Sequence, residues 1–271
     1  MEIDVLTLFP NIFTSPLQES ILRIAQERGK VTIRIHDLRQ FATDRHRVTD
    51  EPPYGGGPGM ILKPEPLMRG VEALQRQGIP AKVILLTPQG TLFTQDKAQE
   101  LAREKRLLLL CGRYGGVDER VVQCCVDEEL SIGDYVLTGG ELPALVVIDA
   151  VVRLLPGVVG NEDSLRQDSF AQGLLDAPQY TRPAEYRGYR VPDILLSGNH
   201  QAIAAWRRRE ALKKTWQRRP ELLSRARLSE EDRRFLRTLA WQQGAETQDA
   251  SSGQKPSQES YAIREKERVS S

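Results

Sequence analysis

The stretch that decides the fold is 82–111, which reads KVILLT at 82–87, a polar helical segment at about 95–103, and RLLLLC at 106–111. Short, continuous apolar runs of this kind are typical of strands that are buried on both faces of a parallel sheet. Two such strands joined by a helix form a strand–helix–strand unit, which is the building block of layered α/β proteins. The sequence therefore predicts an α/β fold with a parallel sheet.

The same alternation continues on both sides of this stretch. Apolar spacing and the positions of Pro and Gly predict further strands at 3–9, 31–37 and 128–132, and helices at 16–28, 64–77, 117–125 and 141–155. The segment 53–59 is so rich in Pro and Gly that no regular element tolerates it. We interpret it as either a close-packed turn or a ligand contact.

The character of the chain changes after residue 157. Periodic apolar residues are few up to 178, and three helices are then expected at 200–217, 220–226 and 229–241, the last one opened by a capping pair of Ser229 and Asp232. The segment 242–271 is polar and is predicted to be disordered. We therefore expect a catalytic domain at 1–159, a linker at 160–178, a small all-helical domain at 179–241 and a disordered tail at 242–271.

Length and composition exclude several classes of protein. The chain has 271 residues, of which 39% are hydrophobic, so it can bury a core in one or two domains. No apolar run approaches the length of a membrane-spanning helix, and MEIDVLTLFP lacks the basic start of a signal peptide. Three cysteines without metal-ligand spacing predict reduced thiols in a cytoplasmic protein.

The charge is distributed unevenly along the chain. The net charge is only +1, which excludes a uniformly basic nucleic-acid binder. Between residues 200 and 241, however, twelve Arg and Lys residues face five acidic ones, and Trp206 and Trp216 lie among them. Arginine suits phosphate recognition, so this segment predicts contact with a nucleic-acid backbone. A solvated helix face is the alternative interpretation.

Three glycine-containing segments follow predicted strands, at 87–90, 112–116 and 132–140. In an open α/β sheet, the loops at the carboxyl ends of the strands line the ligand crevice. Neither a GxGxxG nor a GxxxxGK[ST] motif is present, so the usual dinucleotide and P-loop sites are excluded. Taken singly, each segment could be an ordinary turn; together they predict a ligand site.

A polar cluster in the predicted linker is the candidate for proton transfer. Arg153 closes a predicted helix, and Ser164, Asp168 and Ser169 follow it. A carboxylate on a mobile segment beside an arginine can accept a proton once substrate orders that segment, so we expect 160–169 to be disordered without substrate. The alternative is that Asp168 caps a helix at 170–175.

A set of motifs in this order resembles the bacterial tRNA (guanine-N1)-methyltransferase family, TrmD. The motifs are LFPNIF at 8–13, PYGGGPGM at 53–60, TPQG at 87–90, CGRYGGVDER at 111–120, SIGDYVLTGGELPA at 131–144, LPGVVGN at 155–161, DSF at 168–170 and LLSGNH at 195–200. The resemblance covers about residues 1–241. It implies a SPOUT-class domain with a deep trefoil knot, a homodimer with shared active sites, and S-adenosylmethionine as methyl donor.

The resemblance also implies roles for individual residues. The implied substrate is the guanine at tRNA position 37, and the implied general base is Asp168, supplied by the partner subunit. Arg153 beside it would stabilise negative charge on O6 of the base or orient Asp168. No membrane partner is expected. The implied donor-binding residues are Leu86, Thr87, Pro88, Gly112, Tyr114, Gly116, Ile132, Gly133, Asp134, Tyr135, Val136, Leu137, Gly139 and Gly140. The implied substrate-binding residues are Gly55, Gly56, Gly57, Gly59, Ser164, Ser169, Asn199 and His200.

One position departs from the family pattern. The family usually has a glutamate where this chain has Gly115. No residue of this chain is therefore predicted as a metal ligand, and a magnesium requirement stays open. Two other functions remain as alternatives: an RNA-binding module without catalysis, and a related methyltransferase that acts on ribosomal RNA or on another tRNA base.

Overall fold

The structure is a computed structural model that describes residues 1–160 and 168–251, with side chains described up to 241. The chain divides into two compact units, Met1–Leu165 and Arg166–Ser271. Each unit is described by itself.

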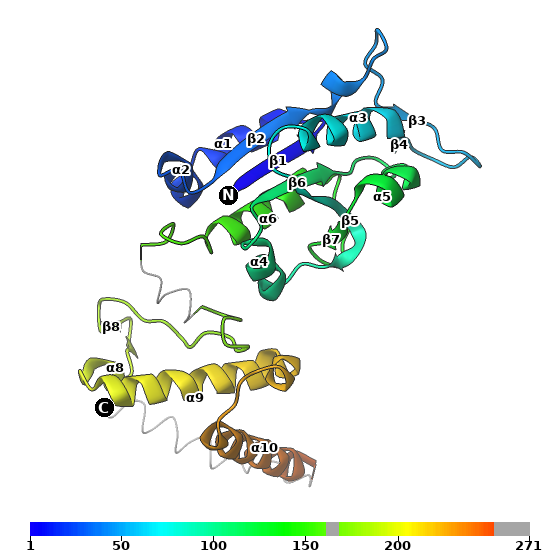
Figure 1. The fold of residues 1–271 in the computed structure, drawn as a ribbon. Coiled ribbons are helices and arrows are strands. Elements are labelled where there is room, and N and C mark those ends of the chain that lie inside the picture. The colour runs from blue at the N-terminus through cyan, green and yellow to red at the C-terminus, as the bar shows by residue number, and fades with distance from the viewer. Residues whose placement is uncertain (161–167, 252–271) are drawn as a thin grey trace. The chain divides into compact units, whose positions relative to one another are not determined.

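The first unit is built on a five-stranded sheet with the order β2-β1-β6-β5-β7 (Figure 1). Its strands are β1 (Glu2–Thr7), β2 (Thr32–Asp37), β5 (Lys82–Leu92), β6 (Arg106–Cys111) and β7 (Glu128–Ser131). Every neighbouring pair is parallel, which confirms the predicted sheet. A separate two-stranded ribbon joins β3 (Asp50–Glu51) to β4 (Ile61–Leu62).

Helices cover both faces of this sheet. The helical elements are η1 (Pro10–Phe13), α1 (Thr14–Leu17), α2 (Ser20–Glu27), η2 (Leu38–Phe41), α3 (Pro64–Gln75), α4 (Gln95–Leu101), α5 (Glu119–Cys125) and α6 (Glu141–Val152). Alternate residues of β6 serve two cores: Leu107 and Leu109 pack in the cluster that includes α2, α4 and α6, whereas Leu108 and Leu110 pack in the cluster that includes α3 and α5. This two-sided burial explains the uninterrupted run of leucines.

Two elements of this unit differ from the prediction. The expected helix at 16–28 is two helices, α1 and α2, because Ser20 takes a left-handed backbone conformation with φ of +46°. The segment 87–90 is not a separate loop but part of β5, which reaches Leu92 through a register shift against β7. A Cβ on Gly90 would lie 2.4 Å from the backbone of Glu129 and Leu130, so this glycine permits the close approach of the two strands.

The second unit is not all-helical, contrary to the prediction. A two-stranded hairpin of β8 (Glu185–Tyr186) and β9 (Tyr189–Arg190) precedes its helices. These are α8 (Asp193–Leu196), α9 (His200–Arg218), the short η3 (Pro220–Ser224) and α10 (Glu230–Ser251). Because α10 continues beyond Trp241, the predicted start of the tail at 242 does not mark a helix end; residues 252–271 lie outside the described residues.

The capping pair at the start of α10 is confirmed. The Ser229 backbone N–H donates to Asp232 Oδ2 at 2.8 Å, and the Asp232 N–H donates to Ser229 Oγ at 3.1 Å. The Arg208 guanidinium of α9 also binds the Asp232 carboxylate at 2.8 Å. Burial tends to raise the pKa of Asp232, but the hydrogen bonds from Arg208 and Ser229 outweigh it and lower this pKa.

The described part of the predicted linker belongs to the second unit. Leu174 and Ala177 are buried, and the Leu175 N–H donates to Thr215 Oγ1 of α9 at 2.9 Å. A Cβ on Gly173 would lie 2.8 Å from Ala226 Cα, so the chain is tightly packed there. Residues 168–178 are therefore an ordered edge of the second unit, while 161–167 lie outside the described residues.

Candidate active site

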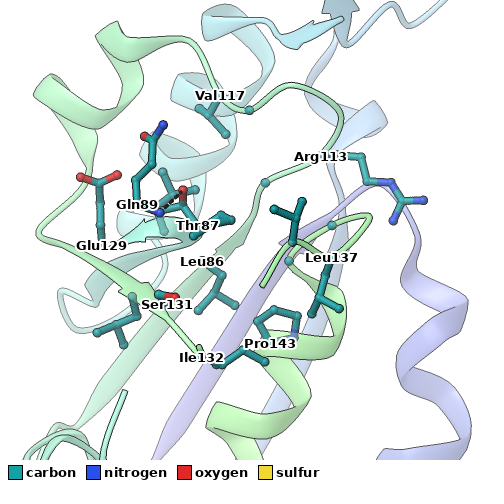
Figure 2. A pocket seen from close by; sticks show the side chains of 18 of the residues that line it. Leu86, Thr87, Gln89, Arg113, Val117, Glu129, Ser131, Ile132, Leu137 and Pro143 are labelled. Carbon is teal, nitrogen blue, oxygen red and sulfur yellow. Dashed lines mark hydrogen bonds between the residues drawn. The ribbon is translucent and has the colours of Figure 1, made fainter. Parts of the chain in front are cut away.

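The first unit has a cavity of about 380 Å³ at the carboxyl ends of β6 and β7, beside the middle of β5 (Figure 2). Its walls come from residues 85–89 in the middle of β5, from the segment after β6, and from the end of β7 and the segment that follows it. In Figure 2 the polar side chains of Thr87, Gln89 and Glu129 lie together at one part of the wall. The volume falls in the usual range for small-molecule sites, and the place is where open α/β sheets bind ligands.

Every implied donor-binding residue except Asp134 lines this cavity. The sequence reasoning also missed several lining residues, which are Leu85, Gln89, Arg113, Gly115, Val117, Glu119, Val122, Glu129, Leu130, Ser131, Thr138 and Pro143. Three of them, Arg113, Gly115 and Thr138, lie between predicted residues, and the others come before or after the runs of predicted residues. Ser131, a polar residue at the end of β7 and two residues before Gly133, was a usable signal.

Glycines let the backbone itself form part of the cavity wall. Gly116 has φ of +128°, and no atom lies within 4 Å of the place where its Cβ would stand. Gly133 has φ of +147°, and the Tyr135 ring packs against it. A Cβ added to Gly133 would lie 2.5 Å from that ring. The wall therefore presents backbone where side chains would otherwise fill the space.

The segments after β6 and β7 are in direct backbone contact with each other. The Gly140 N–H donates to the Gly112 carbonyl at 2.8 Å, and a Cβ on Gly140 would lie 2.7 Å from Cys111 Cα. Arg113 and Gly139 form an isolated antiparallel bridge at the same place. Both loops are therefore held by direct backbone contact and not only by side chains.

Glu141 is a buried carboxylate next to this contact, and it was not predicted from the sequence. It is the first residue of α6 and is only 2% exposed. Its Oε1 accepts from Thr7 Oγ1 of β1 at 2.9 Å, and its Oε2 lies 3.3 Å from Arg113 Nη1. The Arg113 guanidinium also lies 4.4 Å from the centre of the Phe9 ring. Glu141 thus joins β1, α6 and the loop after β6.

Cys111 lies next to this carboxylate and is buried. Burial and the charge of Glu141 raise the pKa of its thiol well above the usual value, although a hydrogen bond with Thr7 opposes the shift. A thiol with a raised pKa is a poor nucleophile. Cys111 therefore serves packing.

Gly115 fixes the loop after β6 against the small ribbon. Its N–H donates to the Met60 carbonyl at 2.8 Å, and an added Cβ would lie 3.0 Å from Met60 O and Ile61 Cδ1. Among the described residues, no group of three or more His, Cys, Asp or Glu side chains is placed to hold a metal ion.

The two candidate proton-transfer residues lie in different units. Arg153 ends α6, where its N–H donates to the Asp149 carbonyl at 3.2 Å. Asp168 begins a compact turn in which its carbonyl accepts from the Ala171 N–H at 3.2 Å. Residues 170–175 form turns and not a helix, so the alternative of a helix cap is wrong.

The implied substrate-binding residues are spread over both units. Gly55, Gly56, Gly57 and Gly59 form an exposed loop between β3 and β4 in which each has positive φ. Asn199 caps α9 by accepting from the Ala202 N–H at 3.1 Å, His200 is exposed, and Ser169 Oγ accepts from the Asp176 N–H at 3.0 Å. Ser164 lies outside the described residues.

Comparisons with known proteins agree on one family. The model described as tRNA (Guanine-1)-methyltransferase TrmD matches residues 1–225. A protein of Moorella thermoacetica named tRNA (guanine-N(1)-)-methyltransferase is 55% identical over 249 residues, which is 91% of this chain and all of that protein. Proteins with the same name from Geobacillus kaustophilus and Dictyoglomus turgidum are 56% and 53% identical, over 88% of this chain and 97% and 96% of theirs.

The described residues contain no helix that combines the length and the apolar character needed to cross a membrane. The three cysteines form no disulfide, and Cys111 is the buried one.

Proposed function

Because the chain belongs to the tRNA (guanine-1)-methyltransferase TrmD family, we propose that it transfers a methyl group from S-adenosylmethionine to N1 of guanine 37 of tRNA. The observation that carries this proposal is the cavity, because the three motif-bearing segments that the resemblance assigns to the donor form its wall. The proposal places the reaction in the cytoplasm.

The cavity fits the donor in size and in chemistry. Its volume of about 380 Å³ suits a nucleoside with an amino-acid side arm. Figure 2 shows Leu86, Ile132, Leu137 and Pro143 as an apolar part of the wall that suits a purine ring. Polar groups such as Thr87, Gln89 and Glu129 suit hydroxyl, amino and carboxylate groups.

Asp168 and Arg153 would perform the chemistry on the base. Guanine N1 carries a proton and is a weak nucleophile until that proton leaves, so the Asp168 carboxylate accepts it as N1 forms the new bond to carbon. Arg153 then stabilises the negative charge that develops on O6. When bound, S-adenosylmethionine supplies an already activated methyl group on a positively charged sulfur, which leaves as a neutral thioether.

The proposed enzyme is a homodimer in which Asp168 acts at the partner's cavity. An apolar face of the first unit supports a second copy as partner: Leu142 and Val146 of α6 are 55% and 46% exposed, and Val136 beside the cavity is 85% exposed. Leu142 and Val146 are one helical turn apart and share a face of α6, and exposed apolar faces are typical of protein interfaces. A shared site also explains why the cavity and Asp168 belong to separate units.

We further propose that the backbone forms the deep trefoil knot of the SPOUT class. The contact between Gly140 and Gly112 supports this, because it brings the backbones of the two segments together with no room for a side chain at Gly140. The basic segment of α9 and α10 would hold the anticodon stem–loop by its phosphates, and the target base would be turned out of its stack.

The variant Asp168→Asn tests the proposed base. We expect it to bind S-adenosylmethionine as the wild type does, and to lose methyl transfer by about 10²- to 10⁴-fold because the amide cannot accept the proton. Calorimetry with the donor and transfer of labelled methyl to tRNA measure the two effects. Asp193→Asn, an exposed carboxylate of the same unit, is the matched control. Near-normal turnover of Asp168→Asn would rule out this base.

A further inference from the structure

The hairpin β8–β9 places two exposed tyrosines side by side on the second unit. Tyr186 and Tyr189 are directly paired across the strands, so their side chains leave the same face of the ribbon. They are 61% and 83% exposed, and every residue from 181 to 190 is exposed. These rings therefore contribute nothing to the core of the second unit, and packing does not account for them.

The turn between the tyrosines carries an arginine in an unusual backbone conformation. Arg187 and Gly188 have φ of +53° and +80°, the pattern of a two-residue type I′ turn. Asn, Asp or Gly is the ordinary residue at the position of Arg187, because other side chains are strained there. The Arg187 Cζ lies 5.3 Å from the centre of the Tyr186 ring, so the guanidinium is held over that ring.

The surroundings of the hairpin favour an anionic, aromatic ligand. Arg182, Arg187 and Arg190 are exposed on this segment, and its acid Glu185 is paired with Arg190 at 3.4 Å. Ala184 and Val191, which flank the two strands and are joined by a 2.8 Å hydrogen bond, line a cavity of about 370 Å³. Tyr180 and Arg207 also line that cavity.

We infer that the hairpin is a stacking platform for unpaired nucleotides of the RNA substrate. Bases stack on Tyr186 and Tyr189, and Arg187 contacts the adjoining phosphate. This combination of aromatic faces and arginine is how proteins hold single-stranded nucleic acid with little sequence preference. The inference rests on the proposed function, since it concerns how the same RNA is held.

The double variant Tyr186→Ala/Tyr189→Ala tests the platform in the full-length protein. We expect its affinity for an unmodified tRNA transcript to fall by about tenfold or more, with an unchanged slope of log affinity against log salt, because stacking releases no counterions. The KM for tRNA should rise more than kcat falls. Tyr186→Phe/Tyr189→Phe keeps the rings and should restore affinity to within about twofold of the wild type. If the double variant Tyr186→Ala/Tyr189→Ala binds the tRNA transcript as tightly as the wild type does, the inference is overturned.

The arginine is tested by the salt dependence. Arg187→Gln should reduce the magnitude of the slope of log affinity against log salt by about one, as expected for the loss of one phosphate contact. Arg103→Gln, which changes an exposed arginine of the first unit, is the matched control and should leave the slope unchanged. An unchanged slope for Arg187→Gln would contradict the phosphate contact.

Two further measurements distinguish a stacking platform from a subunit interface. RNA containing 4-thiouridine should crosslink under ultraviolet light to Tyr186 or Tyr189 in the wild type, and crosslinks confined to α9 would overturn the platform. In sedimentation, the double variant Tyr186→Ala/Tyr189→Ala should have the same oligomeric state as the wild type. If the variant is a smaller species, the tyrosines belong to a subunit interface instead. If the wild type neither binds tRNA nor methylates it, the proposed function fails. If the wild type does both and the double variant Tyr186→Ala/Tyr189→Ala does them equally well, the hairpin inference alone fails.

Discussion

At the scale of single residues, Glu141 connects the wall of the cavity in the first unit to the sheet. Its carboxylate accepts from Thr7 of β1 and pairs with Arg113 of the cavity wall, while it is 2% exposed. A buried acid tolerates this position only because both oxygens have partners. The residue lies at the start of α6, where the helix dipole also favours a negative charge.

Removing this carboxylate should destabilise the protein and loosen the cavity. We expect Glu141→Ala to lower the free energy of unfolding by about 3 kcal/mol, because it leaves Arg113 without its acid. Urea denaturation measures the loss, and donor affinity measured by calorimetry should fall with it. Removal of Arg113 as well should recover part of the stability. A Glu141→Ala protein as stable as the wild type would contradict this account.

The residues that line the cavity could be predicted from the sequence where the backbone of the glycine-containing motifs forms its wall. Glycines and their neighbours in the motifs line the cavity as the resemblance implied, with Asp134 the exception. Glu141 and Arg113 were not predicted, because their importance depends on a buried pairing with Thr7 of a strand far away in the sequence. Sequence spacing contains no signal for such a contact.

At the scale of elements, β5 and β7 approach each other closely only because Gly90 has no side chain. We expect Gly90→Ala to lower the free energy of unfolding by about 2–3 kcal/mol, since its Cβ would lie 2.4 Å from the backbone of β7. Thermal unfolding measures the effect. Gly160→Ala, where an added Cβ meets no atom within 4 Å, is the control. Equal stability of the two variants would refute the close-approach argument.

The start of α10 gives a prediction about pH. The pKa of Asp232 is lower in the folded protein than its ordinary value of 3.8, so the folded state favours the ionised carboxylate. The stability this provides is present above that ordinary value and is lost as pH falls through the folded pKa. The difference in unfolding free energy between wild type and Asp232→Asn should therefore be largest near neutral pH and shrink below about pH 4. A difference that stays constant on acidification would show that the Arg208 pair contributes nothing.

Elements with strong periodicity were predicted well, and those set by backbone details were not. The strand Arg106–Cys111 and the start of α9 at His200 agree with the expectation. The break at Ser20 and the hairpin β8–β9 were missed, because both depend on positive φ at residues other than glycine. Neither Ser20 nor Arg187 is a residue that usually indicates such a conformation.

At the scale of the whole molecule, the proposed shared site predicts complementation between two inactive variants. Asp168→Asn lacks the base, and Leu137→Arg puts a long charged side chain into the donor cavity. Mixed dimers would contain one intact site, so an equimolar mixture after subunit exchange should regain about a quarter of the wild-type rate. Each variant alone is the control. A mixture as inactive as its components would show that both residues act within one subunit.

The charge distribution is also a property of the whole chain. The net charge of +1 averages an acidic first part and a segment from 200 to 241 that carries twelve basic residues against five acidic ones. The structure places this segment on α9, η3 and α10, whereas the cavity described above belongs to the other unit. Under the proposed function, RNA and methyl donor would therefore bind to different units of the chain.

The most direct test of the central claim is to identify the methylated nucleotide. Purified protein, unmodified tRNA transcripts with guanine at position 37 and methyl-labelled S-adenosylmethionine are incubated together, and the RNA is digested and analysed by mass spectrometry. The account predicts 1-methylguanine at position 37, and no label in a transcript with adenine at that position. A methyl group on another nucleotide, or none on any tRNA, would contradict it.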